Sequence, residues 1–84
     1  MKKGYYAEML LAEQVILLIS EGKYLSQVKK GNNLLNLYSL NDFFVEVYYS
    51  VVADKIEKIE IMNDLSRIDQ YIDEKLKKET VQLN

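Results

Sequence analysis

The chain has no cysteine, no histidine, no proline and no tryptophan. Without cysteine it can form neither a disulfide nor a thiolate zinc site. Without histidine it lacks the commonest general base, the commonest metal ligand and the side chain that most often changes charge near neutral pH. Small domains often depend on disulfides, metals or oligomerisation for stability. Self-association is therefore the reinforcement that this composition leaves open.

Strong charge and long apolar runs are also missing. Lys and Arg number 11 and Asp and Glu 13, for a formal charge of −2 without marked clustering of either sign. This balance does not indicate a nucleic-acid partner, and Lys29 and Lys30 beside a turn are typical of a protected sheet edge. No apolar run reaches the roughly 18 residues of a membrane span, so we expect no membrane partner. The lack of cysteine fits a reducing compartment, and we expect a cytoplasmic protein.

Residues 34–62 are dominated by β-branched, aliphatic and aromatic side chains, broken by short polar pairs. This composition predicts consecutive antiparallel strands, preceded by one with a weaker pattern. The predicted strands are 23–30, 34–40, 43–50 and 55–62. The predicted turns are 31–33, 41–42 and 51–54. The run is more apolar than one buried sheet face requires, which indicates a second buried surface.

The pairing of the second and third strands follows from their polar interruptions, Asn36 and Glu46. Direct pairing of these two places both on one face and leaves a three-residue loop, 40–42. A two-residue turn would instead pair Leu37 with Glu46, and a slip of one residue exchanges every side chain between faces. We therefore predict the three-residue loop. The expected core face carries Leu35, Leu37, Phe43, Val45, Val47, Tyr49, Ile59 and Ile61. The expected outer face carries Leu34, Asn36, Tyr38, Phe44, Glu46, Tyr48, Lys58, Glu60 and Met62.

Residues 5–21 have the spacing of one amphipathic helix. Its broad apolar face comprises Tyr5, Met9, Ala12, Val15, Ile16 and Ile19. Three further large apolar residues lie on its opposite side: Tyr6, Leu10 and Leu17. Gly22 accepts a positive φ and can end the helix. The apolar stretch 9–19 follows two lysines, as in a signal peptide, but Glu13 and Gln14 interrupt it, so we interpret it as a helix of the domain.

Residues 65–77 predict a second helix, capped by Asn63 and Asp64. Its apolar stripe comprises Leu65, Ile68, Ile72 and Leu76. We expect residues 79–84 to form a frayed tail. The predicted fold is α+β, a four-stranded antiparallel meander flanked by an N-terminal and a C-terminal helix in the order α-β-β-β-β-α. Both helices are expected on one sheet face, within a single domain spanning residues 1–84.

The chain has few residue patterns that indicate catalysis or the binding of a phosphate or metal. No hydroxyl residue lies in a nucleophile-elbow or Ser-x-x-Lys pattern, and the three glycines lie too far apart to build a phosphate-binding loop. Glu46 and Glu60 share a predicted face, where paired carboxylates could do acid–base work or hold a hard cation. The other interpretation is a solvated face on which Lys58 offsets Glu46. We predict no catalytic residue, no metal site and no cofactor, and we do not expect an enzyme.

The segment LYSLNDFFVEVYY at 37–49, followed by IEI at 59–61 and the helix from Leu65 to Tyr71, resembles a group of small uncharacterised bacterial αβ proteins. The similarity covers roughly residues 18–76. Its shared positions are strand-core residues rather than site residues. The resemblance implies a standalone bacterial domain and supplies no activity.

The aromatic outer face could be covered within the chain, could bind a partner or could line a pocket for a small apolar ligand. Large exposed apolar patches mark interaction sites on monomers, so we favour a partner. The expected function is that of a non-catalytic homodimeric protein-interaction module, such as an adaptor, immunity or antitoxin-like protein. The alternative is a small-molecule binding protein that uses the outer aromatic face. The expected interface residues are Tyr6, Leu10, Leu17, Tyr38, Phe44, Tyr48 and Met62.

Overall fold

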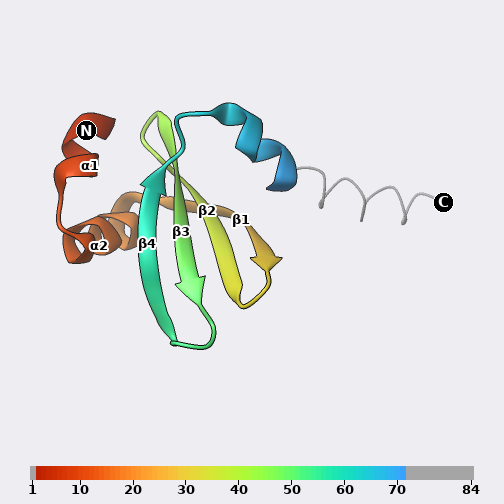
Figure 1. The fold of residues 1–84 in the computed structure, drawn as a ribbon. Helices are drawn as coiled ribbons and strands as arrows, with labels where there is room; N and C mark the ends of the chain where they lie inside the picture. The colour runs from red at the N-terminus through yellow and green to blue at the C-terminus, as the bar shows by residue number, and fades with distance from the viewer. Residues whose placement is uncertain (1, 72–84) are drawn as a thin grey trace.

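The computed structural model describes residues 2–71 of the chain. Two helices, α1 (Lys3–Glu8) and α2 (Leu11–Glu21), come before the sheet, and a 3₁₀ helix, η1 (Leu65–Ile68), comes after it. The strands are β1 (Lys23–Lys30), β2 (Asn33–Leu40), β3 (Phe43–Ser50) and β4 (Lys55–Ile61). They pair antiparallel in chain order (Figure 1). The predicted α+β class and four-stranded meander are confirmed. The predicted helical residues 72–77 and the predicted tail 79–84 lie outside the described residues.

The predicted N-terminal helix is two helices. Met9 and Leu10 have extended backbones, with ψ of 155° and 152°, and they separate α1 from α2. The carboxylate of Glu13 accepts a hydrogen bond of 3.0 Å from the backbone N–H of Leu10, which satisfies a donor at the start of α2. The break turns α1 back over α2. The Tyr6 hydroxyl then donates to the backbone carbonyl of Gln14, and the Gln14 side chain donates to the Tyr6 carbonyl, both at 2.9 Å.

The register of β2 and β3 differs from the prediction. Leu37 pairs with Glu46, so the connection is the two-residue turn Asn41-Asp42 rather than a three-residue loop. Asn41 takes a φ of +55°, a conformation that asparagine tolerates and that tight hairpins require. The expectation that the two polar residues Asn36 and Glu46 share a face is wrong. Asn36 pairs with Val47, so it lies on the face opposite to Glu46. The side chains of β2 consequently lie on the faces opposite to those predicted.

The sheet is covered on both faces, and this corrects the expectation that both helices share one face. One core contains Val45 and Val47 of β3 and is covered by α1 and α2. Its buried members are Tyr6, Leu18, Leu40, Phe43, Val45 and Val47. The other core lies beneath the C-terminal helical segment, on the opposite side of the sheet (Figure 1). Its buried members are Val28, Leu35, Leu37, Met62 and Tyr71. Because both faces of the sheet are apolar, each requires a cover.

Gly22 ends α2 as expected, but for a different reason. Its φ is −77°, within the range of any residue. A Cβ added at this position would lie 2.6 Å from the backbone oxygen of Leu18. Close approach of the chain to the last turn of α2, rather than a left-handed conformation, therefore requires glycine at this position.

Candidate functional site

The most polar buried group is the carboxylate of Glu46, in the middle of β3, on the face covered by the C-terminal segment. Glu46 is 0% exposed. The Tyr71 hydroxyl donates a hydrogen bond of 2.8 Å to Oε2 of Glu46. Arg67 Nη2 lies 2.9 Å from Oε1, although the geometry is that of an ion pair without a directed hydrogen bond. Glu46 is thus held by two residues that follow the sheet in the chain.

A second carboxylate lies beside the first. Glu60 of β4 pairs directly with Glu46 of β3, so both side chains emerge on one face. Lys58 Nζ lies 3.1 Å from Glu60 Oε1, and Arg67 Nη1 lies 3.6 Å from Oε2. The Tyr48 hydroxyl, which accepts a hydrogen bond from Arg67, lies 3.5 Å from Oε2. Arg67 therefore connects both carboxylates with a phenol.

The electrostatics of this group are balanced. The hydrogen bond from Lys58 lowers the pKa of Glu60, and Arg67 lowers it further. The hydrogen bond to Tyr48 and the charge of Glu46 both raise the pKa of Arg67. Burial, followed by the hydrogen bond to Glu46, raises the pKa of Tyr71 above its usual value. Two carboxylates are matched by two cations, which is the arrangement of a structural ion-pair network.

This geometry corrects part of the sequence interpretation. Glu46 and Glu60 do share a face, but Glu46 is buried rather than solvated, and Arg67 rather than Lys58 lies against it. Lys58 instead pairs with Glu60 and lies 4.4 Å from the centre of the Tyr48 ring. Within residues 2–71 no group of three or more carboxylate, histidine or cysteine ligands is placed to hold a metal ion. The arrangement fastens the C-terminal segment to the sheet.

Arg67 and Tyr71 are the residues that sequence reasoning missed in this network. They are spaced i, i+4, so a helical segment presents both on one side. Arg67 is also the only arginine in the chain. A glutamate inside an apolar strand needs a cation when it is buried. These two signals together could have indicated the pairing.

Most of the expected interface residues are used inside the chain. Tyr6 is 0% exposed beneath the N-terminal helices, and Met62 is 4% exposed beneath the C-terminal segment. Four others are partly buried against the two cores: Leu17, Tyr38, Phe44 and Tyr48. Only Leu10, at 72% exposure, has most of its surface available to a partner. The aromatic outer face is thus largely filled by the chain itself.

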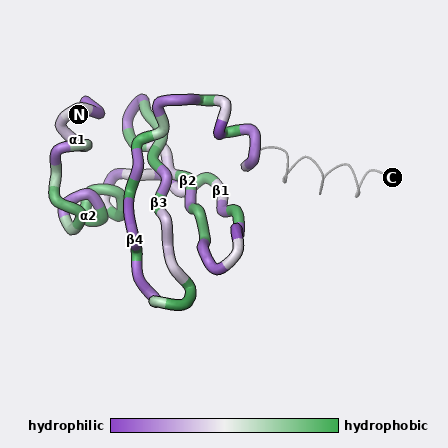
Figure 2. Tube along the Cα trace, viewed as in Figure 1, coloured by the Kyte–Doolittle hydropathy of each residue, from purple (hydrophilic) through white to green (hydrophobic). Residues whose placement is uncertain are grey.

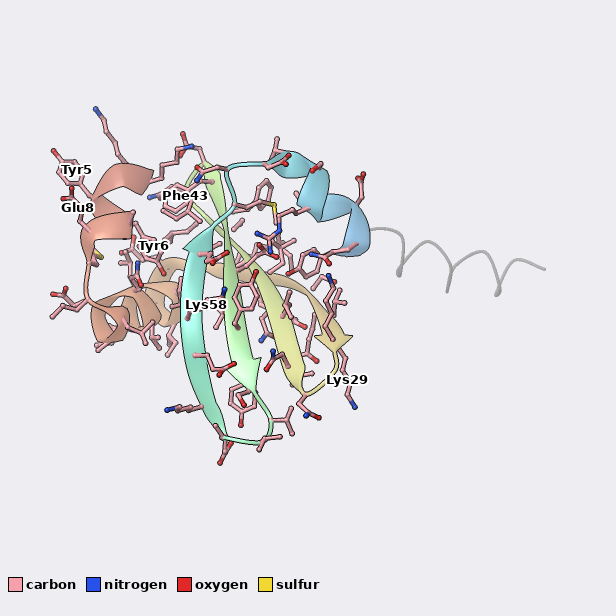
Figure 3. All side chains as sticks on the ribbon, in the orientation of Figure 1. Tyr5, Tyr6, Glu8, Lys29, Phe43 and Lys58 are labelled. Carbon is pink, nitrogen blue, oxygen red and sulfur yellow. The ribbon has the colours of Figure 1, made fainter. Side chains whose placement is uncertain are left out.

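A different apolar surface is open. Helix α2 is mostly hydrophobic (Figure 2), and it turns Gln14 and Leu18 toward the sheet. Three residues of the apolar side expected to form the core are therefore exposed, namely Tyr5, Ile16 and Ile19, whereas Met9 packs against the first core. We call the exposed set the outer helical surface; its members and their exposed fractions are Tyr5 69%, Leu10 72%, Ile16 65% and Ile19 79%. Tyr5 points away from the sheet, whereas the adjacent Tyr6 points toward it (Figure 3).

Comparison with known proteins adds no relative. No protein-family model, curated protein sequence or solved structure matches this chain. Among residues 2–71 no helix has both the length and the hydropathy to cross a membrane. The function of this protein is therefore inferred from its own surfaces.

Proposed function

We propose that this protein is a non-catalytic homodimeric interaction module, of the kind found among adaptor, immunity or antitoxin-like proteins, and that two copies meet through the outer helical surface. The observation that carries the proposal is the exposure of Ile16 and Ile19, at 65% and 79%, on a helix whose other side is already buried. A helix that is apolar on opposite sides is typical of one buried on both. Large apolar side chains grouped on a surface indicate an interaction site.

A second copy suits this surface because the pattern along α2 complements itself. Ala12, Ile16 and Ile19 follow the i, i+4, i+7 spacing of one helical stripe, with Val15 at its margin. In an antiparallel pairing of α2 with its copy, centred between Val15 and Ile16, the small Ala12 lies opposite Ile19. Alternating small and large residues across a helix pair favours close packing. Such a contact is isologous and closes as a dimer.

The ligand-binding alternative has no comparable support. It depends on the aromatic outer face, where Tyr71 is 2% exposed and Phe44 and Tyr48 pack against the second core. Arg67 and Lys58 engage the hydroxyl and the ring of Tyr48. The described chain therefore occupies the surface that an apolar ligand would need.

Light scattering on gel-filtered protein at micromolar concentration tests the dimer. We expect about twice the chain mass of 9.9 kDa. Ile19→Lys should give a folded monomer, because burying an unpaired ammonium in an apolar interface is costly. The matched control is Val52→Lys, at a β-branched residue of similar exposure, 77%, in the hydrophobic turn between β3 and β4 (Figure 2). A wild-type monomer at every accessible concentration, or a dimer that survives Ile19→Lys, would contradict the proposal.

A further inference from the structure

The outer edge of β4 presents backbone groups that no strand within residues 2–71 uses. The Met62 N–H donates to the carbonyl of Phe44 at 2.9 Å, so this pair belongs to the hydrogen-bonded set of the β3–β4 ladder. Bonded pairs alternate with non-bonded pairs in an antiparallel ladder. Ile59 pairs with Val47 and Ile61 pairs with Val45, and in this alternation both are non-hydrogen-bonded pairs. Their N–H and C=O groups therefore point away from β3, toward the open edge of the sheet.

This stretch of edge forms the floor of a groove. Ile59, Glu60 and Ile61 line a pocket of about 610 Å³, a volume within the range of ligand-binding sites. One wall is α1, through Gly4 and Ala7, and Arg67 after the sheet contributes to the other. The α1 wall carries little side-chain bulk, since a Cβ added at Gly4 would find nothing within 4 Å. An extended chain can therefore approach the outward-facing backbone groups.

The first halves of both edge strands are protected. The first half of β4 is interrupted by a register shift opposite Tyr48 and Tyr49, which displaces Glu57 from the ladder. The first half of β1 has a similar irregularity between Tyr24 and Ser26. Bulges and edge charges are the usual means of blocking strand addition. The segment 59–61 is regular, paired residue for residue with β3, and it lies inside the groove.

The groove also offers a cation. Lys3 Nζ donates to Asn63 Oδ1 at 3.2 Å, and among the described ion pairs none involves Lys3. Arg67, on the opposite wall, is already matched by Glu46 and Glu60. Asp64 also lines the groove, but its carboxylate accepts a hydrogen bond of 3.0 Å from the backbone N–H of Ser66. Lys3 is therefore the cation that remains available to an acidic group of the occupant.

We propose that the edge of β4 binds an extended peptide segment of a partner protein as a fifth strand. Backbone groups of the peptide pair with those of Ile59 and Ile61, apolar side chains face Gly4 and Ala7, and a carboxylate approaches Lys3. Edge addition takes its affinity from main-chain hydrogen bonds and its specificity from alternate side chains. A second copy fits less well. Pairing both outward-facing residues across a two-fold axis sets Glu60 opposite its own copy, and like charges directly opposite destabilise a sheet.

The inference extends the proposed interaction module with a second surface, and its test is separate from that of the dimer. The probe is the acetylated, amidated hexapeptide Glu-Thr-Val-Thr-Val-Thr, added at millimolar concentration to isotopically labelled protein. In antiparallel pairing its valines lie opposite Ile61 and Ile59 and a threonine lies opposite Glu60. Its glutamate then lies toward Asn63, the hydrogen-bond partner of Lys3. We expect the amide hydrogen exchange of Ile59 and Ile61 to slow at least tenfold. The same peptide methylated on alternate backbone nitrogens, in the set that faces β4, should not bind. Ile19→Lys, made to disrupt the helical surface, should bind the unmodified peptide as the wild type does.

Charge provides the matched control. Lys3→Glu should weaken the affinity for the peptide by about two- to fivefold, the range of an exposed ion pair. Lys29→Glu makes the same change on β1, at the far edge of the sheet (Figure 3), and should leave the affinity unchanged. Unaltered exchange at Ile59 and Ile61, or equal binding of the methylated peptide, would overturn the proposal. Protection of these amides that rises with protein concentration in the absence of peptide would also overturn it, assigning the edge to a second copy.

Discussion

The hydroxyl of Tyr71 donates a hydrogen bond of 2.8 Å to the carboxylate of Glu46, which lies 25 residues earlier in the chain. This contact joins the middle of the sheet to the last residue that the structure describes. Glu46 also lies 2.9 Å from the guanidinium of Arg67, one turn before Tyr71 in the helical segment. Burying a carboxylate is costly unless it has such hydrogen-bond and ion-pair partners. The attachment of the C-terminal segment therefore depends on a few polar contacts as well as on apolar packing.

Tyr71→Phe should destabilise the protein by about 1.5–3 kcal/mol, the usual cost of losing a hydrogen bond to a charged group. The ring and its packing remain, while Oε2 of Glu46 loses the donor that it has among the described residues. Urea unfolding followed by circular dichroism measures the loss. The control is Tyr24→Phe at a tyrosine that is 54% exposed, where a change within about 0.5 kcal/mol is expected. Equal effects of the two substitutions would argue against a buried Glu46–Tyr71 contact.

Arg67→Met should be more harmful than its exposure suggests, because it leaves the carboxylate of Glu46 buried without a cation. Breaking a buried ion pair costs about 3–5 kcal/mol, and the lower end applies because the Arg67 side chain is 40% exposed. Lys58→Met removes the other cation of the network, but its pair with Glu60 is exposed and should contribute little. The comparison is made in the same urea titration. A larger loss from Lys58→Met would mean that Glu60, rather than Glu46, needs the compensating charge.

Stability should fall in alkali through Tyr6. Burial raises the pKa of this hydroxyl from 10.0 to about 12. The folded protein holds the proton more tightly than the unfolded chain, so this contribution is present below pH 10.0 and is lost as the pH rises toward about 12. Tyr71, whose pKa is also raised by burial, adds a loss of the same sign.

The alkaline effect is measured by urea unfolding at a pH below 10.0 and at a pH between 10.0 and about 12. Tyr6→Phe should be less stable than the wild type near neutral pH, by about 0.5–1.5 kcal/mol for the lost hydrogen bond to Gln14. It should also lose less stability between the two pH values. Tyr5→Phe is the adjacent control, since Tyr5 is 69% exposed. An alkaline loss that persists unchanged in Tyr6→Phe would exclude this tyrosine as its source.

Two glycines should respond in opposite directions to the same substitution. Gly22→Ala places a Cβ 2.6 Å from the Leu18 carbonyl oxygen, and relieving such an overlap costs about 1–3 kcal/mol. Gly4→Ala introduces its methyl group into open space within α1. It should stabilise the protein by about 0.4–1 kcal/mol, because alanine reduces the freedom of the unfolded chain. Thermal unfolding of both variants tests the pair, and a harmless Gly22→Ala would show that α2 can end without this close approach.

The local elements of this protein were largely readable from its sequence. The bounds predicted for β1 and β3 agree with the structure, and those of β2 and β4 differ by one residue at one end. Runs of β-branched and aromatic residues between short polar turns carry that information locally, since each strand and turn depends mainly on its own residues. The α+β class follows from the same signals.

The relationships between elements could not be obtained in this way. The break at Met9 and Leu10 depends on Tyr6 and Gln14 meeting each other's backbone. The register predicted for β2 and β3 assumed that Glu46 needs a polar neighbour within the sheet. The partners of Glu46 are instead Arg67 and Tyr71, which follow β4 in the chain.

For a similar reason, most of the expected interface residues proved to be buried or partly buried within the chain. Apolar periodicity identifies the sides of α2 that avoid water, but it does not say which side meets the sheet and which meets a partner. By itself the sequence determined that this chain forms a four-stranded meander with more apolar surface than one face can bury. The tertiary structure decided which cover each face received, because long-range contacts such as Arg67 with Glu46 select between arrangements that local preferences leave nearly equal.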